Sequence, residues 1–474
     1  MMKKAFILSY LILLFSGIAI AQDLEGFSER DIIGTARYVG MAGAMNAVGG
    51  DPSAVLDNPA GLGLYQRMEI AMTMQGHFDY NKQVGYDYKN VNRFQIPQIS
   101  WVFSWNYSGN VGRLFFSNFM VGYNRLKSFN RVSWALGNDM LYSLADVAAY
   151  QAEGLHTSFL ERDDTWDNVD VGWLTNLSYW NYLINPTSDS LHYIPCIESG
   201  EYINNALTIE ESGYIDEYNF SWAGNIDHRW YVGASLGLRA LSYSKRTHYE
   251  EVFERNDVES FYLGSSITQS GIGVNGTFGL IYRPIRLLRI GASIQTPTSF
   301  AVSTRTQSWM KSHIVSQEVT TPLSGGVDNY SLPMRLSTGL AFQMRNFGLL
   351  SLQYDYRHHK EMRDVHTMKV GAEGVIANNL FLNVGYAYES SFAKEDDLYG
   401  VSLTTIRTDL DFKNPKFSHY VGVGIGYRGR IFIAQAAYQM RMQTYHMHAH
   451  EFQDMPYEMN ALTHRAVLTI SWHD

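Results

Sequence analysis

The sequence predicts an all-β protein: a transmembrane antiparallel β-barrel of about 14 strands, with an N-terminal plug inside its lumen. Three observations lead to this prediction. The 474-residue chain is 14% aromatic and contains 40 Gly, a heavy load for a water-soluble domain. Apolar residues alternate with small or polar ones from Met68 onward. A Gly- and Ala-rich stretch precedes the alternating part and cannot build a core of its own.

Residues 1–21 have the features of a secretory signal peptide. Lys3 and Lys4 provide a basic start, an apolar run extends from Phe6 to Phe15, and small residues precede Gln22. Such a segment is removed on export. We therefore expect a mature chain that begins at Gln22 and works outside the cytoplasm.

Composition and motifs exclude several functional classes. The net charge of −9 argues against a nucleic-acid partner. No apolar stretch of about twenty residues follows the signal peptide, so membrane helices are excluded. Cys196 is the single cysteine, so no internal disulfide is possible. The chain has no Gly-x-Ser-x-Gly motif, phosphate loop or zinc-type Cys/His spacing, and we expect neither an enzyme nor a cofactor.

The plug is predicted at 22–67, and its centre is the small-residue stretch Gly34–Leu64. Asp51-Pro52 and Asn58-Pro59 each place a capping side chain directly before a proline that suits the first turn of a helix. These signals predict two very short helices or turns. Because small residues cannot form a core, the stretch must sit inside something larger.

This stretch resembles the N-terminal hatch of the FadL/TodX family, outer-membrane transporters for long-chain fatty acids and other hydrophobic compounds. The family carries an Asn-Pro-Ala signature near the end of its hatch. The matching residues are Asn58, Pro59 and Ala60, followed by Gly61 and Leu62. The alternative is that these residues only fill the barrel and never contact a ligand.

The barrel, at 68–474, is predicted from period-two alternation, which a wall between lipid and lumen requires. Ile272, Val274 and Phe278, for example, share one face of a strand, opposite Gly273 and Asn275. Fourteen such segments are present, an even number that brings both ends of the wall to one side. They lie at 68–78, 95–108, 112–126, 216–227, 229–245, 269–283, 286–300, 332–345, 347–360, 364–376, 379–392, 416–429, 430–445 and 460–472.

The connections alternate between short turns and longer loops. Short turns, such as Arg283–Arg286 and Gly429-Arg430, belong on the periplasmic side, so the hatch enters from there. The segments 279–300, 369–391 and 419–439 also resemble hairpins of FadL-type barrels, so the likeness covers nearly the whole mature chain. The last strand departs from the usual pattern, since His473-Asp474 follow its aromatic Trp472.

The largest extracellular insertion is expected at 127–215, with a surface helix within Asp139–Gly154. An aromatic cluster follows that helix. On an outer loop such a cluster either binds something or packs over the barrel mouth. The family resemblance implies that it is a landing patch for ligand. Its members are Trp166, Trp173, Tyr179, Trp180 and Tyr182.

Three inward basic residues, Arg239, Arg289 and Lys369, are candidates for binding a ligand head group, because a carboxylate favours a partly desolvated cation. Inward acids are also present at Asp355, Glu373 and Glu389. The alternative is that these charges form lumenal salt bridges that hold the hatch.

A second candidate site is formed by His446, His448 and His450. Residues two apart in a strand share a face, so these imidazoles would line one edge and could bind a transition metal or haem iron. The alternative is a solvated loop tip above the wall.

The resemblance implies passive uptake of hydrophobic compounds, most notably long-chain fatty acids, across the outer membrane of a Gram-negative bacterium. Ligand would land on outer loops, enter an apolar pocket, and leave inward or sideways when the hatch shifts. The expected partners are a fatty-acid-like small molecule and outer-membrane lipid, with the chain acting as a monomer. Two alternatives remain: a haem receptor, and a barrel that transports nothing and serves as a scaffold for a secretion system.

Overall fold

The computed structural model describes residues 27–107, 114–162, 164–167, 171–198, 200–254, 258–344, 347–359, 362–377, 379–393 and 407–474. The signal peptide expected at 1–21 and the first five residues of the expected hatch, 22–26, lie outside these ranges. Within them, no helix combines the length and the apolar character needed to cross a membrane.

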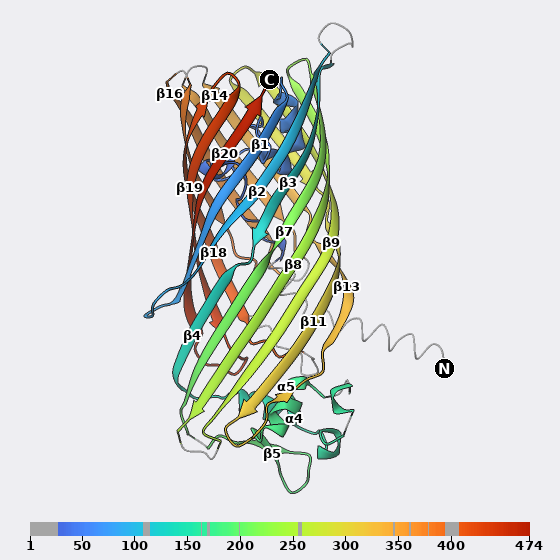
Figure 1. Ribbon diagram of the computed structural model, residues 1–474, viewed down its shortest axis with the longest axis vertical. Coiled ribbons are helices and arrows are strands. Elements are labelled where there is room, and N and C mark those ends of the chain that lie inside the picture. Colours follow the sequence, from blue (N-terminus) through green and yellow to red (C-terminus); the bar gives the residue numbers. More distant parts are fainter. Residues whose placement is uncertain are drawn as a thin grey trace, which may run out of the picture.

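The wall is a closed antiparallel barrel with 14 strand positions, as predicted (Figure 1). Closure comes from the first and last strands, which pair from Glu69↔His473 to Gln83↔Met459. Closure leaves no open sheet edge, which lipid could not satisfy. The strands are β1 (Glu69–Gln83), β2 (Lys89–Asn106), β3 (Leu114–Ser128), β4 (Arg131–Met140), β7 (Ile203–Ile226), β8 (Trp230–Phe253), β9 (Ser260–Ile285), β10 (Leu288–Gln295), β11 (Thr298–Ser312), β12 (Val319–Thr320), β13 (Ser324–Leu332), β14 (Arg335–Met344), β15 (Gly348–Arg357), β16 (Val365–Ala377), β17 (Leu380–Glu389), β18 (Phe412–Arg428), β19 (Phe432–His448) and β20 (Tyr457–His473).

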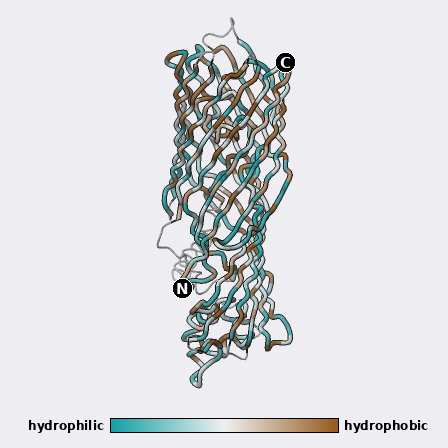
Figure 2. Tube along the Cα trace, turned by 90° about the vertical axis from the view of Figure 1, so that its left-hand side faces the viewer, coloured by the Kyte–Doolittle hydropathy of each residue, from teal (hydrophilic) through white to brown (hydrophobic). Residues whose placement is uncertain are grey.

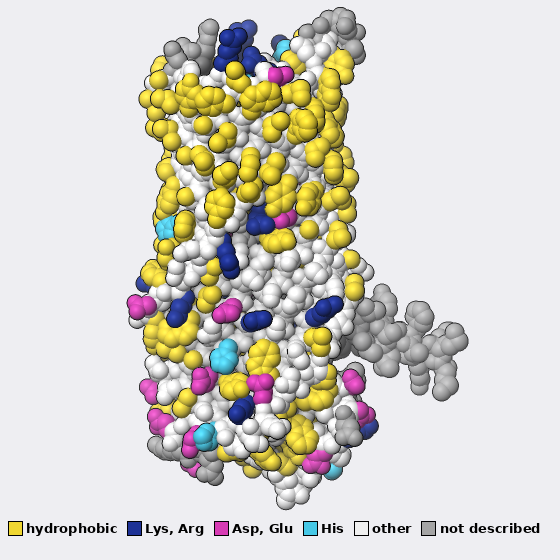
Figure 3. All heavy atoms as spheres, viewed as in Figure 1, with side chains coloured by type: hydrophobic (Ala, Val, Ile, Leu, Met, Phe, Trp, Pro, Cys, Tyr) yellow, Lys and Arg dark blue, Asp and Glu magenta, His cyan; other side chains and the backbone are white. Residues whose placement is uncertain are grey.

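The alternation read from the sequence matches the two faces of the wall. On β17, Leu382 and Val384 point outward and are exposed, whereas Asn383 and Gly385 point into the lumen. Apolar and polar residues alternate along the strands in Figure 2. In Figure 3 the outward apolar side chains cover one half of the barrel, and the charged side chains gather beyond that band and at the rim. This surface suits a lipid-facing wall.

The two ends of the barrel differ. The predicted short turns after β7, β9 and β18 lie at the same end as the C-terminus, at the top of Figure 1. The opposite end carries a small helical cap, and by the turn-length rule this is the extracellular end. The cap contains α4 (Leu144–Ala152), η3 (Thr157–Phe159), η4 (Thr165–Asp167), α5 (Trp173–Trp180), β5 (Ile184–Pro186) and β6 (Tyr193–Pro195).

The insertion expected at 127–215 is shorter than predicted, because wall strands occupy both of its ends. β3 continues to Ser128, β4 follows it, and β7 already begins at Ile203. The helix expected within 139–154 is confirmed as α4, which starts at a capping box formed by Ser143 and Asp146.

One wall position bends inward at Phe129-Asn130, between β3 and β4. β2 pairs with β3 only from Gln98 to Asn106, and the first half of β2 pairs with β1 alone. β4 instead approaches the lumenal face of β1, where Arg131 Nε lies 3.1 Å from Asp79 Oδ1. Continuous strand pairing is therefore interrupted between β2 and β4.

The strand expected at 286–300 is also divided, into β10 and β11, at Thr296-Pro297. The facing position is divided between β13 and β14 at Pro333-Met334. Proline has no N–H to donate to the ladder, so a break at both sites is expected.

Candidate functional site

The hatch is a chain of short turns inside the lumen. It contains α3 (Ala36–Gly40), η1 (Ala54–Leu56) and η2 (Pro59–Leu64), and nearly all of its residues are buried. Of the two predicted signals, Asn58 caps η2, and Asp51 closes a turn before η1, whose N-cap is Ser53. The Asn58 side chain accepts a hydrogen bond from Ala60 N at 3.0 Å, with Pro59 in the first turn of η2. Asp51 Oδ1 accepts from Ser53 N at 2.9 Å.

The Asn-Pro-Ala segment packs against the wall where two glycines leave its inner face without side chains. Asn58 Nδ2 donates to Leu280 O at 3.2 Å, which ties the hatch to β9. Gly279 of β9 and Gly233 of β8 lie opposite each other beneath it. A Cβ at Gly279 would lie 1.9 Å from Asn58 Oδ1, so only glycine permits this approach.

Buried ion pairs connect the hatch to the wall. Charges removed from water need such partners, so each pair fixes the hatch at one point. Burial raises the pKa of Glu29, but the positive charges of Lys127 and Arg441 outweigh this and hold the pKa at about 2. The pairs are Glu29–Lys127 (2.9 Å), Asp31–Arg465 (2.9 Å), Asp31–Arg441 (3.1 Å), Arg37–Glu373 (2.6 Å) and Asp57–Arg335 (2.5 Å).

Phe27 of the hatch occupies an apolar recess in the wall. Its ring packs edge-on against Phe129 and Tyr243, with ring centroids 5.5 and 5.3 Å away. Phe129 lies at the β3–β4 bend, and Tyr243 lies on β8. The rest of the recess is lined by Ile215, Leu241, Phe300, Val302, Tyr330 and Leu332.

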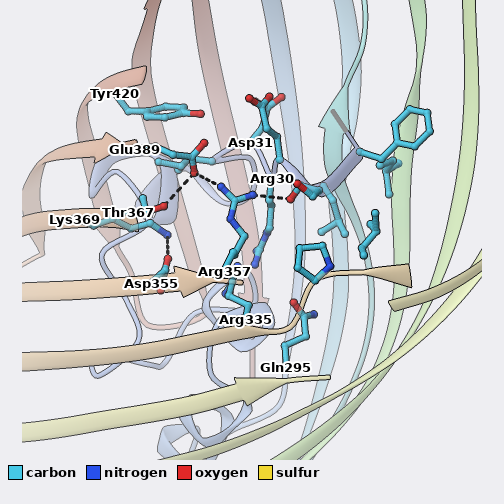
Figure 4. A pocket seen from close by; sticks show the side chains of 18 of the residues that line it. Arg30, Asp31, Gln295, Arg335, Asp355, Arg357, Thr367, Lys369, Glu389 and Tyr420 are labelled. Carbon is cyan, nitrogen blue, oxygen red and sulfur yellow. Dashed lines mark hydrogen bonds and ion pairs between the residues drawn. The ribbon is translucent and has the colours of Figure 1, made fainter. Parts of the chain in front are cut away.

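Two cavities border Phe27, and charged side chains line both. One, of about 140 Å³, lies beside Phe129 and Tyr243 and is bordered by Lys127 and Arg131. The other, of about 50 Å³, is shown in Figure 4. There Arg357 bonds both Glu389 (2.8 Å) and the hatch carbonyl of Ser28 (2.6 Å). The site thus combines an apolar recess with a charged border.

The three head-group candidates are not brought together. Arg239 and Lys369 both line the cavity of Figure 4, but each is paired, Arg239 with Glu217 at 2.7 Å and Lys369 with Asp355 at 2.8 Å. Arg289 lies on the other side of the hatch, at the end of the barrel that carries the C-terminus, where its Nη1 donates to Val48 O at 2.8 Å.

Several residues of the site were not identified from the sequence. Arg335 of β14 and Arg357 of β15 occupy inward positions, and the period-two pattern of a strand does not reveal which residues they pair with. Phe27, Glu29 and Asp31 precede the glycine-rich stretch and carry no motif. Acidic residues in the plug directly before its glycine-rich centre, together with inward arginines in the wall, were the available signal.

Comparison with known proteins decides the fold family. A scan against family models and a search of curated proteins find no match. A solved FadL homologue from Pseudomonas aeruginosa matches 94% of this chain and 99% of its own, with 9% identity and a TM-score of 0.57. The toluene transporter TodX of Pseudomonas putida matches 94% and 99%, with 12% identity and a TM-score of 0.52. The toluene transporter TbuX of Ralstonia pickettii matches 93% and 98%, with 15% identity and a TM-score of 0.52.

The chain has the FadL/TodX fold. The resemblance inferred from Asn58-Pro59-Ala60 is therefore confirmed at the level of fold. At these identities the likeness concerns the architecture, namely the closed barrel that surrounds an N-terminal hatch.

In this FadL-type barrel the aromatic cluster of the cap is mostly core. Trp173 is 2% exposed, and Trp166 and Tyr179 pack against a cluster of buried apolar residues. That cluster joins cap residues to residues at the extracellular end of the wall, so the cap packs over the barrel mouth. Only Trp180 (44% exposed) and Tyr182 (57% exposed) present large faces to solvent.

The three histidines do not line one edge. His446 and His448 lie on the outer face of β19, but the strand ends at His448 and the chain then turns, which buries His450. Burial, with a smaller effect of His448, lowers the pKa of His450 to about 4. Among the described residues, no three His, Cys, Asp or Glu side chains form a group that could hold a metal.

Proposed function

We propose that the chain is an outer-membrane transport protein for passive uptake of hydrophobic molecules that carry an ionised head group, with long-chain fatty acids as the best-fitting class. The observation that carries this proposal is Phe27, a hatch side chain seated in an apolar recess with a charged border. Ligand sites of this kind combine an apolar lining with a few placed polar groups.

The ligand takes the place of Phe27. The cavity beside it measures about 140 Å³, whereas pockets for drug-sized ligands measure roughly 300–1,000 Å³. A long acyl chain therefore fits only when the hatch residues around Phe27 leave the recess. Ligand binding then favours the displaced hatch, because only that arrangement offers the recess.

The charged border favours an amphiphile over a plain hydrocarbon. Arg30 Nη1 pairs with Asp57 at 2.7 Å, while its buried Nη2 has no hydrogen-bond partner among the described residues. A carboxylate entering the cavity of Figure 4, which Arg30 lines, would gain charge-assisted hydrogen bonds that toluene cannot make. The TodX and TbuX structures are described as toluene transporters, so hydrophobic cargo is shared and the head group is the proposed difference.

The β3–β4 bend supports a sideways exit. Phe129, at the bend, lines both the recess and the 140 Å³ cavity, and strand pairing between β2 and β4 is interrupted beside it. A hydrophobic cargo leaving there passes from the recess toward lipid without crossing the hatch.

The test is binding of a fluorescent long-chain fatty acid to detergent-purified protein and its uptake into cells. Phe27→Ala empties the recess, so we expect fatty-acid affinity to rise about tenfold or more, the scale of burying one aromatic side chain. Phe278→Ala, on the lipid-facing surface, is the matched control and should change nothing. Unchanged affinity in Phe27→Ala would remove the recess as the ligand site, and toluene binding as tight as the fatty acid would remove the head-group argument.

A further inference from the structure

A second concave site lies on the outside of the wall and plays no part in transport through the lumen. It is an open pocket of about 800 Å³ at the extracellular ends of β16, β17, β18 and β19. Its lining includes Arg363, His366, Tyr388, Lys416, Phe417 and His446. These are outward-facing or loop side chains, so the pocket opens away from the lumen.

The pocket lies at the outer border of the apolar band. Outward residues of β17 run from Leu380 through Val384 to Tyr386 and Tyr388, so the band ends in aromatic residues. Tyr386 Oη lies 2.7 Å from Nδ1 of His419 on β18. The same Tyr–His pairing recurs on the outer face at Tyr354–His366 (2.7 Å) and Tyr438–His464 (2.5 Å).

These pairs form a belt of rings with polar tips. Amphipathic aromatics collect where a membrane meets water. The pocket therefore sits at head-group level, with Tyr388 and Phe417 toward the apolar band.

A bulge in β18 shapes the pocket. Its pairing with β19 shifts register between Pro415 and Ser418, at a proline that cannot donate to the ladder. Consecutive residues of a regular strand point to opposite faces, yet Lys416 and Phe417 are both exposed here. The bulge thus places a cation and an aromatic ring side by side on the outer surface.

The pocket has an excess of positive charge. Within the described residues, neither Arg363 nor Lys416 has an ion pair, and both are exposed. Asp364, the one acidic residue among the described lining residues, is already occupied: it accepts from Tyr356 Oη at 2.7 Å and pairs with His358 Nδ1 at 2.9 Å. Arg363 and Lys416 therefore have no acidic partner in the described part of the chain and can bind an anion.

We propose that this pocket binds the phosphorylated head group of a glycolipid in the outer leaflet. Arg363 and Lys416 contact the phosphate, and the acyl chains lie along the apolar band below Tyr388 and Phe417. Basic pockets at membrane interfaces recognise lipid head groups in this way. The inference rests on the membrane placement in the proposed function and not on transport.

The test titrates detergent-purified full-length protein with diphosphorylated lipid A and counts bound lipid by native mass spectrometry. We expect Arg363→Gln and Lys416→Gln each to weaken binding roughly fivefold, and the double variant on the order of twenty-five-fold. Arg305→Gln removes an exposed cation from the outer face of β11, outside the pocket, and should bind like wild type. Equal binding by the double variant would overturn the proposal.

Two further arms identify the ligand source. Lipid A stripped of its phosphates should bind at least tenfold more weakly, and equal binding would overturn the phosphate contact. Millimolar inorganic phosphate should not displace the lipid, and full displacement would show a small-anion site instead. Fatty-acid uptake by the double variant should match wild type, so failure of the transport proposal leaves this test intact.

Discussion

Arg37 of the hatch and Glu373 of β16 form a two-point ion pair: Arg37 Nε lies 2.6 Å from Glu373 Oε2, and Nη2 lies 3.2 Å from Oε1. Both side chains are 9% exposed, and 336 residues separate them in the chain. The same guanidinium donates to the carbonyl of Gly50 at 3.3 Å. One wall carboxylate thus positions the arginine that holds the periplasmic turn of the hatch.

Glu373→Ala should loosen the hatch. It leaves Arg37 buried without a carboxylate, and breaking a buried pair from one side costs about 3–5 kcal/mol. Hydrogen exchange of residues 37–50 should accelerate while exchange of the wall strands stays constant. The double replacement Arg37→Met with Glu373→Leu should restore much of the protection. Equally slow exchange in Glu373→Ala would contradict the role of this pair.

Gly279→Ala should displace the Asn-Pro-Ala segment. The added methyl would lie 1.9 Å from Asn58 Oδ1 and 2.9 Å from Pro59 Cδ, so the hatch must move. Gly276→Ala is a matched control on the same strand, because its nearest neighbour would be 3.8 Å away. Amide exchange at Asn58 and Ala60 and fatty-acid uptake should change in Gly279→Ala alone, and unchanged exchange and uptake in Gly279→Ala would refute the close packing.

The attachment of Glu29 should depend on pH in a predictable direction. Its pKa falls from 4.5 to about 2 in the folded hatch, so the stabilisation is complete above pH 4.5 and is lost as the pH falls through 2. The shift corresponds to roughly 3 kcal/mol. Hatch protection should be constant between pH 7 and about 5 and should decline only at lower pH. Lys127→Met should shift that decline to higher pH, and an unshifted profile would exclude Lys127 as its cause.

Ser143→Ala should loosen the cap at its attachment to the wall. The carboxylate of Glu251 on β8 accepts hydrogen bonds from the Ser143 hydroxyl and from Leu144 N, the latter at 2.8 Å. Losing the serine cap costs about 1 kcal/mol, so exchange in α4 should accelerate about fivefold. Ser158→Ala, at an exposed turn of the same cap, is the comparison and should have no effect. Unaltered α4 exchange would show that Glu251 holds the cap without the serine.

The extent of sequence-based prediction is clearest at the hatch. Asn58-Pro59 predicted both a cap and the start of a turn, and both are present. This prediction was possible because capping depends on residues that are neighbours in the chain. The inward position of Glu373 followed from the period of β16. Its partner Arg37 could not be inferred, because nothing local relates a hatch residue to a wall residue more than three hundred positions away.

At the cap and at the β3–β4 bend, too, local structure was predictable from the sequence and long-range contacts were not. The helix at α4 followed from apolar spacing, but the choice between a landing patch and a lid depended on whether Tyr179 would pack against the buried cluster that includes Leu207 of the wall. Phe129 lay beyond the predicted end of its strand, and the inward bend there brings Arg131 of β4 onto Asp79 of β1, a contact between residues 52 positions apart that no local pattern predicts.

Alternation imposed by lipid on one side and lumen on the other is a local property, so the amino-acid order alone specifies the fourteen wall positions and the short plug turns. The tertiary structure decided which buried charges pair, where Phe27 packs and that His450 is buried. Each of these depends on residues that are distant in the chain and meet only when the barrel closes. Electrostatic and packing energies depend on distances across the lumen, and those distances exist only in the folded molecule.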